Sequence, residues 1–292
     1  MANNDLFFEP WEGKEYKKGI KLENGKIKLC EKENEGIKVM VLGLEHYCTD
    51  CDTYKKNGHC TQLPDCKSKT QKVVGEFLNG TNYKSLITFT DIFEYGNRNI
   101  WKYFLFSNFF QIGMPNESAS QNKKYRKETN IDKKEKIKAV NAFAEIVKKN
   151  VPDIIIVWGK EDKDIGSSIL NLLDDKDLEF LTNRKIPRID IDNEESANYV
   201  IPFTILKNKT KNKDSLVIFL DHPASASFTH TKKIYAQKNH RNILCFLGNI
   251  QTIMNWDLNK VKAVNNTKKR KHFTCKFDKN LNWVNSQDFP FK

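Results

Sequence analysis

Four short hydrophobic runs, separated by polar stretches, dominate the pattern along the chain. Residues 37–43, 103–109, 153–159 and 216–221 are continuous apolar segments rich in β-branched or aromatic side chains. Runs of this length and character are typical of strands in a parallel sheet, which helices cover on both faces. We therefore expect these four segments to pair in one buried sheet.

Helical periodicity occupies the stretches between these strands. It is clearest over about residues 132–149, with Asp132 as the expected N-cap and Glu135 as its capping-box partner. Shorter helices are expected over 70–78 and 166–173. Because strands alternate with helices, the predicted fold is α/β, a three-layer α/β/α sandwich around a central, mainly parallel four-stranded sheet. The expected buried face of the longest helix comprises Ile137, Val140, Phe143, Ala144 and Val147.

Polar segments mark the expected limits of this domain. Residues 1–36 are predicted to be a polar N-terminal extension, and residues 256–292 a basic and aromatic C-terminal extension. The α/β domain would then span 37–255, with a cysteine-rich insertion at 48–66 and a surface loop at 116–130. No stretch rich in proline, glycine and serine separates two halves, so we expect one domain.

Composition narrows the class of protein. With 39% hydrophobic and 29% charged residues, the 292-residue chain is typical of a globular protein and not of a disordered one. We find no run of membrane length and no secretion signal, and so expect a cytoplasmic protein without a membrane partner. The net charge of +12 suits DNA, although a biased genome composition also produces an excess of lysine.

Polar side chains follow the expected strands at their carboxyl ends, where ligands bind in open parallel sheets. Glu45 follows the first run, Asn108 ends the second and His222 follows the fourth. A carboxylate can position water beside a cationic sugar, a neutral imidazole can donate to a departing base, and a carboxamide can pair with a pyrimidine edge. Each residue alone has an ordinary structural explanation, such as a turn or a cap. Together they are suited to hydrolysis of an N-glycosidic bond.

The order of these motifs resembles the uracil-DNA glycosylase superfamily. GLEHYC at 43–48 is similar to its Gly-Gln-Asp-Pro-Tyr-His motif, and HPAS at 222–225 to its His-Pro-Ser-Pro motif. SNFF at 107–110 resembles the strand end that reads the base, and VWGK at 157–160 the Leu-Gly-Lys step after the third strand. The resemblance covers about residues 37–250. It implies a glycosylase that removes uracil or a modified pyrimidine from DNA, in repair or in defence against foreign DNA.

The resemblance also implies roles for individual residues. Glu45 and His222 would be catalytic, Asn108 would bind the base, and Tyr47 would exclude the methyl group of thymine. Such an enzyme must flip the base out of the duplex, and an apolar wedge fills the gap. Phe228 is the candidate wedge, with ordinary packing as its alternative. The expected DNA-binding residues are Ser225, Ser227, Phe228, Lys232 and Lys233.

Departures from the family pattern leave other functions open. Glu45 is one methylene longer than Asp, a change on the scale of about 1 Å to which catalytic geometry is sensitive. His46 stands in place of a proline, and Ala224 in place of a serine that grips phosphate. The alternatives are a non-catalytic nucleic-acid-binding module of the same fold and a nucleoside or nucleotide hydrolase.

Four of the seven cysteines form a cluster that begins at the last residue of the first motif: Cys48, Cys51, Cys60 and Cys66. A Cys-x-x-Cys pair with two further thiolates can complete a tetrahedral site, so structural zinc is the expected cofactor. His59 or His46 can replace one of the cysteine ligands. An iron–sulfur cluster is the alternative to zinc. The ordinary explanation is that the four cysteines are reduced thiols that bind no metal. A metal-bound loop here would lie beside Glu45 and could reshape the pocket for a bulky modified base.

Overall fold

The structure is a computed structural model, and it describes residues 5–23, 26–47, 62–93, 96–114, 133–159, 164–180, 188–193, 196–220, 222–223, 272–277 and 283–284. The predicted N-cap Asp132 and the predicted loop at 116–130 lie outside these ranges.

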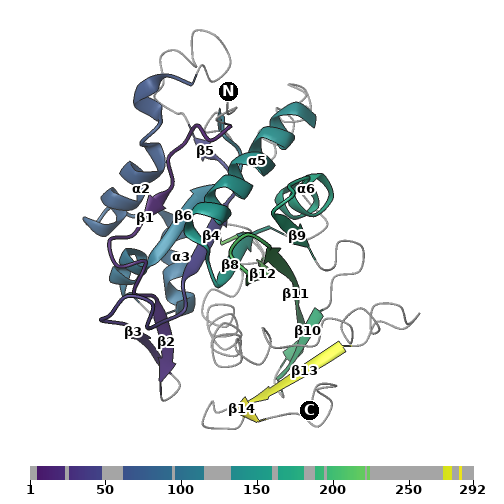
Figure 1. The fold of residues 1–292 in the computed structure, drawn as a ribbon. Coiled ribbons are helices and arrows are strands. Elements are labelled where there is room, and N and C mark those ends of the chain that lie inside the picture. Colours follow the sequence, from purple (N-terminus) through teal and green to yellow (C-terminus); the bar gives the residue numbers. More distant parts are fainter. Residues whose placement is uncertain are drawn as a thin grey trace.

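The four predicted strands form the centre of one sheet (Figure 1). They are adjacent in the order β6 (Phe104–Asn108), β4 (Val39–Gly43), β8 (Ile154–Trp158) and β12 (Lys213–Leu220), and each neighbouring pair is parallel. All residues of β4, β6 and β8 are buried, as expected for strands covered on both faces. The predicted α/β class and the mainly parallel centre are therefore confirmed.

The sheet is wider than the four strands that were predicted, and its outer part contains antiparallel pairs as well as one parallel pair, between β10 and β13. Within the described residues it has ten strands, with β1 pairing antiparallel to β6 and β11 pairing antiparallel to β12. These strands escaped prediction because they are very short or mix polar with apolar residues. The added strands are β1 (Trp11–Glu12), β9 (Leu178–Phe180), β10 (Arg188–Asn193), β11 (Ser196–Asn208), β13 (His272–Phe277) and β14 (Trp283–Val284).

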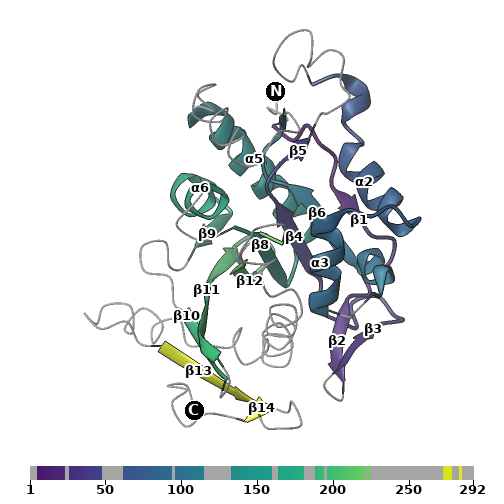
Figure 2. The ribbon, with the colours of Figure 1, turned by 180° about the vertical axis from the view of Figure 1, so that it is seen from behind.

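Helices cover both faces of the central strands (Figures 1 and 2). The helices α2 (Lys69–Leu78) and α3 (Lys84–Phe93) pack on one face, together with the 3-10 helix η2 (Arg98–Tyr103). The helices α5 (Lys133–Asn150) and α6 (Asp164–Leu172) pack on the other. The predicted helices correspond to α2, α5 and α6, whereas α3 was not predicted.

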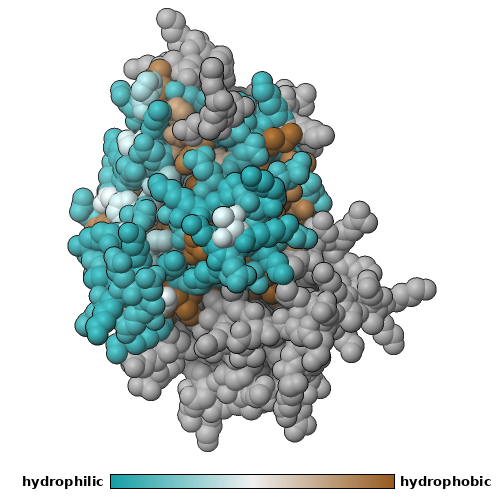
Figure 3. Space-filling model, in the orientation of Figure 1, coloured by the Kyte–Doolittle hydropathy of each residue, from teal (hydrophilic) through white to brown (hydrophobic). Residues whose placement is uncertain are grey.

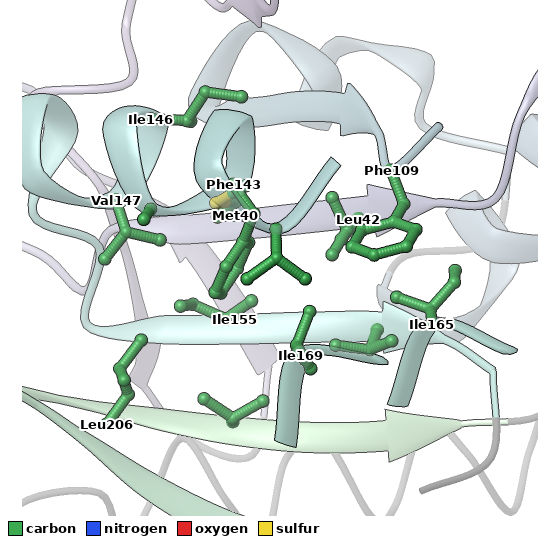
Figure 4. Close-up of a cluster of buried hydrophobic side chains, with 14 of the residues drawn as sticks. Met40, Leu42, Phe109, Phe143, Ile146, Val147, Ile155, Ile165, Ile169 and Leu206 are labelled. Carbon is green, nitrogen blue, oxygen red and sulfur yellow. The ribbon is translucent and has the colours of Figure 1, made fainter. Parts of the chain in front are cut away.

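Side chains alternate along each strand between the two hydrophobic clusters. Figure 4 shows the cluster under α5 and α6, where Phe143 and Ile169 from the helices meet Met40 and Ile155 from the sheet. The predicted buried face of α5 is correct except at Ile137, which is 38% exposed. Periodicity identifies the face of a helix but not how far along it the contact with the sheet extends.

The described part of residues 1–36 packs on the sheet more closely than its polar composition indicates. β1 pairs with β6 at the sheet edge, and a hairpin of β2 (Ile20–Glu23) and β3 (Lys26–Leu29) follows. Phe8, Tyr16 and Ile20 are fully buried, although charged residues surround them in the sequence. A few widely spaced apolar residues are thus enough to anchor this segment.

Hydrophilic residues cover most of the described surface in the view of Figure 3, with hydrophobic residues confined to small areas between them. Among the described helices, none has the length and apolar character needed to cross a membrane.

Candidate functional site

The order of the strands reverses at β4, and this reversal places the site. From β4 the chain passes over one face through α2 and α3 to β6, and then over the other face through α5 to β8. β6 and β8 therefore flank β4 on opposite sides. In open α/β sheets, ligands bind beyond the carboxyl ends of the strands at such a reversal. Gly43 ends β4, so the segment after it lies at the expected binding position.

The predicted residues Glu45, Asn108 and His222 lie at this same edge. Strand register aligns the carboxyl ends, with Gly43 opposite Asn108 and Leu220 opposite Trp158. With neighbouring strands about 4.8 Å apart, the ends of β6 and β12 are separated by about 14 Å across the ends of β4 and β8. Asn108 and the segment leading to His222 thus flank the switch point from opposite sides.

Asn108 is 6% exposed, and its carboxamide extends over the end of β4. A Cβ atom at Gly43 would lie far inside van der Waals distance of Asn108 Oδ1. Only glycine therefore allows the carboxamide to occupy this place. Asn108 Nδ2 lies 3.1 Å from each ring nitrogen of His46.

His46 links this carboxamide to helix α2. Its Nε2 lies 2.8 Å from Thr70 Oγ1, and the ring of Phe8 packs edge-on against it at 4.6 Å between centroids. The side chain is 4% exposed, and this burial, with a smaller contribution from the charge of Lys69, lowers the pKa of His46 to about 3. The imidazole is therefore neutral at physiological pH, and its nitrogens face protein groups.

Gln111 holds the backbone of the same asparagine. Its Nε2 donates to the carbonyl oxygen of Asn108 at 3.0 Å, while its Oε1 accepts from the backbone N–H groups of Phe7 and Phe8 at 3.0 and 2.9 Å. Gln62 donates in turn to the backbone carbonyl of Gln111. The N-terminal segment is thereby tied to the end of β6.

Glu45 follows β4 in a segment that is anchored on both sides. The backbone N–H groups of Phe109 and Phe110 donate to the carbonyl oxygens of Gly43 and Leu44 at 2.9 and 3.0 Å. After Glu45, β5 (His46–Tyr47) pairs with β7 (Gly113–Met114). Glu45 is 8% exposed, so a carboxylate is held at the switch point with little contact with solvent. Tyr47 lies in β5, and only its backbone is described.

His222 contacts Trp158, the last residue of β8. The two rings meet nearly perpendicular with centroids 5.6 Å apart. Burial lowers the pKa of His222 to about 4, so this imidazole is also neutral at physiological pH. The buried indole N–H of Trp158 has no hydrogen-bond partner within the described part of the chain. Its ring packs against Phe89 and Phe106 on the face covered by α2 and α3.

Of the four cysteines that are predicted to bind a metal, one lies within the described residues. Cys66 ends the 3-10 helix η1 (Pro64–Cys66), shortly before α2 begins. Among the described residues there is no group of three or more His, Cys, Asp or Glu side chains that could hold a metal. The remaining ligands and the predicted DNA-binding residues lie outside the described ranges: Cys48, Cys51, Cys60, Ser225, Ser227, Phe228, Lys232 and Lys233.

Three residues of this site were not predicted from the sequence: Thr70, Gln111 and Trp158. Thr70 is a polar residue on the buried face of a helix, and Gln111 follows Asn108 by three positions. Trp158 lies within a motif that was quoted, but a tryptophan in an apolar run is more often a core residue. For Thr70 the available signal was a polar residue on the same helical face as Val74 and Phe77. For Gln111 it was a polar residue three positions after the strand end at Asn108.

Comparison of the chain with protein-family models, with curated proteins and with solved structures finds no match in any of the three. Its function is therefore argued from the chemistry of the site.

Proposed function

We propose that this protein is a DNA glycosylase, which hydrolyses the N-glycosidic bond of uracil or a modified pyrimidine and leaves an abasic site in DNA. One observation carries the proposal. A buried carboxylate at Glu45, an anchored carboxamide at Asn108 and a neutral imidazole at His222 share one edge of the sheet at its switch point. In this proposal the four central strands and their helices form a three-layer glycosylase core, and the other strands are additions to it.

Glu45 would stabilise the positive charge that develops on the sugar. Cleavage of the bond leaves positive charge on the sugar ring, and a carboxylate with little solvent around it stabilises that charge more strongly than one in water. The same carboxylate can orient the attacking water. Its anchored backbone keeps it in position without the cost of reorganisation during the reaction.

His222 would donate a hydrogen bond to the departing base. An imidazole with a pKa of about 4 is neutral under working conditions and carries one N–H. That N–H can donate to a base oxygen as negative charge develops there. Trp158 packs against His222 and limits its motion, which favours a fixed direction for the donated hydrogen bond.

Asn108 would select the base, because a carboxamide presents an acceptor and a donor side by side. A base within a duplex must be flipped out to reach it. The net charge of +12 supports a DNA partner, since lysines that neutralise phosphates release counterions. The cytoplasmic location, the role in repair or defence, and the five expected DNA-binding residues remain predictions.

A base-release assay on uracil-containing and modified oligonucleotides, followed by alkaline cleavage at abasic sites, tests the proposal. We expect Glu45→Gln to lower release at least about 100-fold and His222→Ala by a similar factor, with folding retained. Glu33→Gln is the matched control, because Glu33 is an exposed carboxylate in the turn before β4, whereas Glu45 lies beyond the opposite, carboxyl end of that strand. Its activity should equal that of the parent protein.

Two outcomes would favour the other candidates. The longer carboxylate at Glu45 is the feature that favours a binding module. If the parent protein releases no base while DNA binding survives both substitutions, the protein is such a module. If it cleaves free nucleosides, does not bind DNA, and has an activity that depends only weakly on salt concentration, it is a small-molecule hydrolase.

A further inference from the structure

We propose that Gln111 is a positioning residue, which fixes the Asn108 carboxamide and the Glu45 carboxylate relative to each other. Gln111 lies between β6 and β7 and is 3% exposed. The consequence for a bound base rests on the proposed function, whereas the hydrogen bonds of Gln111 do not depend on it.

The carboxamide of Gln111 spends its whole hydrogen-bonding capacity on backbone groups. Its Nε2 donates to the carbonyl oxygens of Asn108 at 3.0 Å and Phe109 at 3.3 Å. Its Oε1 accepts from the N–H groups of Phe7 and Phe8 at 3.0 and 2.9 Å. A backbone N–H can only donate and a backbone carbonyl can only accept, so these four partners permit one orientation of the carboxamide. A half-turn would break four hydrogen bonds at a buried position.

The turn after β6, which this side chain holds, also holds the backbone that leads to Glu45. The N–H of Phe109 donates to the carbonyl oxygen of Gly43 at 2.9 Å. The N–H of Phe110 donates to that of Leu44, the residue directly before Glu45, at 3.0 Å. A displacement of the turn would therefore move the carboxylate as well as the carboxamide, and catalytic geometry is sensitive to shifts of about 1 Å.

The N-terminal segment supports Gln111 from the other side. Directly after Phe7 and Phe8, the N–H of Glu9 donates to the carbonyl oxygen of Lys67 at 2.8 Å, and β1 then pairs with β6. The two N–H groups that bind Oε1 are thus held by contacts of their own. Through Gln111 this segment becomes part of the framework of the site.

Gln111→Met tests the role in binding, because methionine has a similar length but replaces none of the four hydrogen bonds. Dissociation constants are measured for two oligonucleotides. One carries a uracil nucleotide with a fluorinated sugar that resists hydrolysis, and the other carries a stable analogue of an abasic site. We expect the preference for the oligonucleotide with the base to fall by about tenfold or more. A loss of folded protein weakens both affinities alike and leaves their ratio unchanged.

Gln111→Glu separates hydrogen-bond donation from packing, because it keeps the shape of the side chain. A protonated carboxyl can donate to Asn108 and accept from Phe8, whereas an ionised one can only accept and faces two carbonyl oxygens. Burial beside these oxygens should raise the pKa of the introduced carboxyl above its ordinary value of about 4.3. We therefore expect a preference near that of the parent at about pH 5, and its loss as pH rises towards about 8.

The preference of each variant is compared with that of the parent at the same pH, so that titrations common to both proteins cancel. Gln71→Glu is the control, because Gln71 is exposed on α2 and its introduced carboxyl meets water. It should leave the preference unchanged at every pH. A loss in Gln111→Glu that does not vary with pH, or an unchanged preference in Gln111→Met, would overturn the proposal.

Amide hydrogen exchange of the unliganded proteins tests the arrangement without DNA. In Gln111→Met we expect the N–H groups of Phe109 and Phe110 to exchange faster than in the parent, after correction for global stability. In Gln111→Glu those of Phe7 and Phe8 should stay protected, because a carboxyl accepts from them in either protonation state. Unchanged exchange at Phe109 and Phe110 in Gln111→Met would overturn the proposal. If exchange changes as expected but the parent binds both oligonucleotides equally, the proposed function fails while the positioning role of Gln111 stands.

Discussion

At the scale of single residues, the polar groups at the carboxyl edge are held by partners that are distant in the chain. Asn108 contacts His46, His46 contacts Thr70, and Gln111 joins Asn108 to Phe8. Buried polar groups need such partners, because an unsatisfied one costs about 1–3 kcal/mol. The same bonds that stabilise the fold therefore also orient the groups proposed to meet the base.

Gly43→Ala should inactivate the site through a steric clash with the side chain of Asn108. The added methyl group would collide with Asn108 Oδ1 and displace the carboxamide, so we expect a loss of base release of about 100-fold and a destabilisation of about 1–3 kcal/mol. Base release and urea unfolding are measured on the same preparation. Gly75→Ala in α2 is the control, because a Cβ there meets nothing within 4 Å. It should stabilise the protein by about 0.5–1 kcal/mol and leave activity unchanged.

His222 makes the stability of the protein depend on pH. Burial lowers its pKa from 6.5 to about 4, so the unfolded state takes up the proton first as pH falls. The free energy of unfolding should therefore decrease below about pH 6.5, by at most about 1.4 kcal/mol per pH unit until about pH 4. Urea unfolding of the parent and of His222→Gln over this range isolates the contribution. Parallel stability curves for the two proteins would contradict it.

At the scale of elements, the predictable segments were those whose packing matches their pattern. The continuous apolar runs became β4, β6, β8 and β12, because both faces of these strands are buried. Helix α3 was missed because threonines have low helix propensity. In the structure Thr88 and Thr90 donate to the carbonyl oxygens of Lys84 and Leu86. Packing of Phe89 and Phe93 on the sheet then stabilises a helix that propensity alone does not favour.

Helix α2 is the element through which a metal would act on the site. It carries Thr70, and Cys66 lies just before its start. We expect the purified protein to contain about one zinc ion per chain, bound by the four clustered thiolates. Cys66→Ser should reduce the zinc content and weaken base release, since the start of α2 would lose an anchor.

Elemental analysis checks this expectation. Cys30→Ala should keep the metal, because Cys30 is buried in a different part of the chain. Iron together with visible absorption would identify the alternative cluster. Protein that is folded and active but free of metal would contradict the prediction.

At the scale of the whole molecule, the site depends on the path of the chain. The crossovers from β4 to β6 and from β6 to β8 pass over opposite faces, and this creates the switch point beside Gly43. The polar segment at the N-terminus then closes over the same edge, where Phe8 covers His46. Residues that composition assigns to an extension are thus part of the surroundings of the proposed site.

The sequence by itself determined the four buried strands, three of the helices, and the presence of Glu45, Asn108 and His222 at strand ends. These features depend on local patterns, because the spacing of apolar residues along the chain indicates which of them are buried. Only the tertiary structure decided that His46 and Thr70 hold Asn108, since 62 and 24 residues separate the paired positions. Such contacts depend on how α2 packs beside β4 and β6, and no periodicity along the chain encodes that packing.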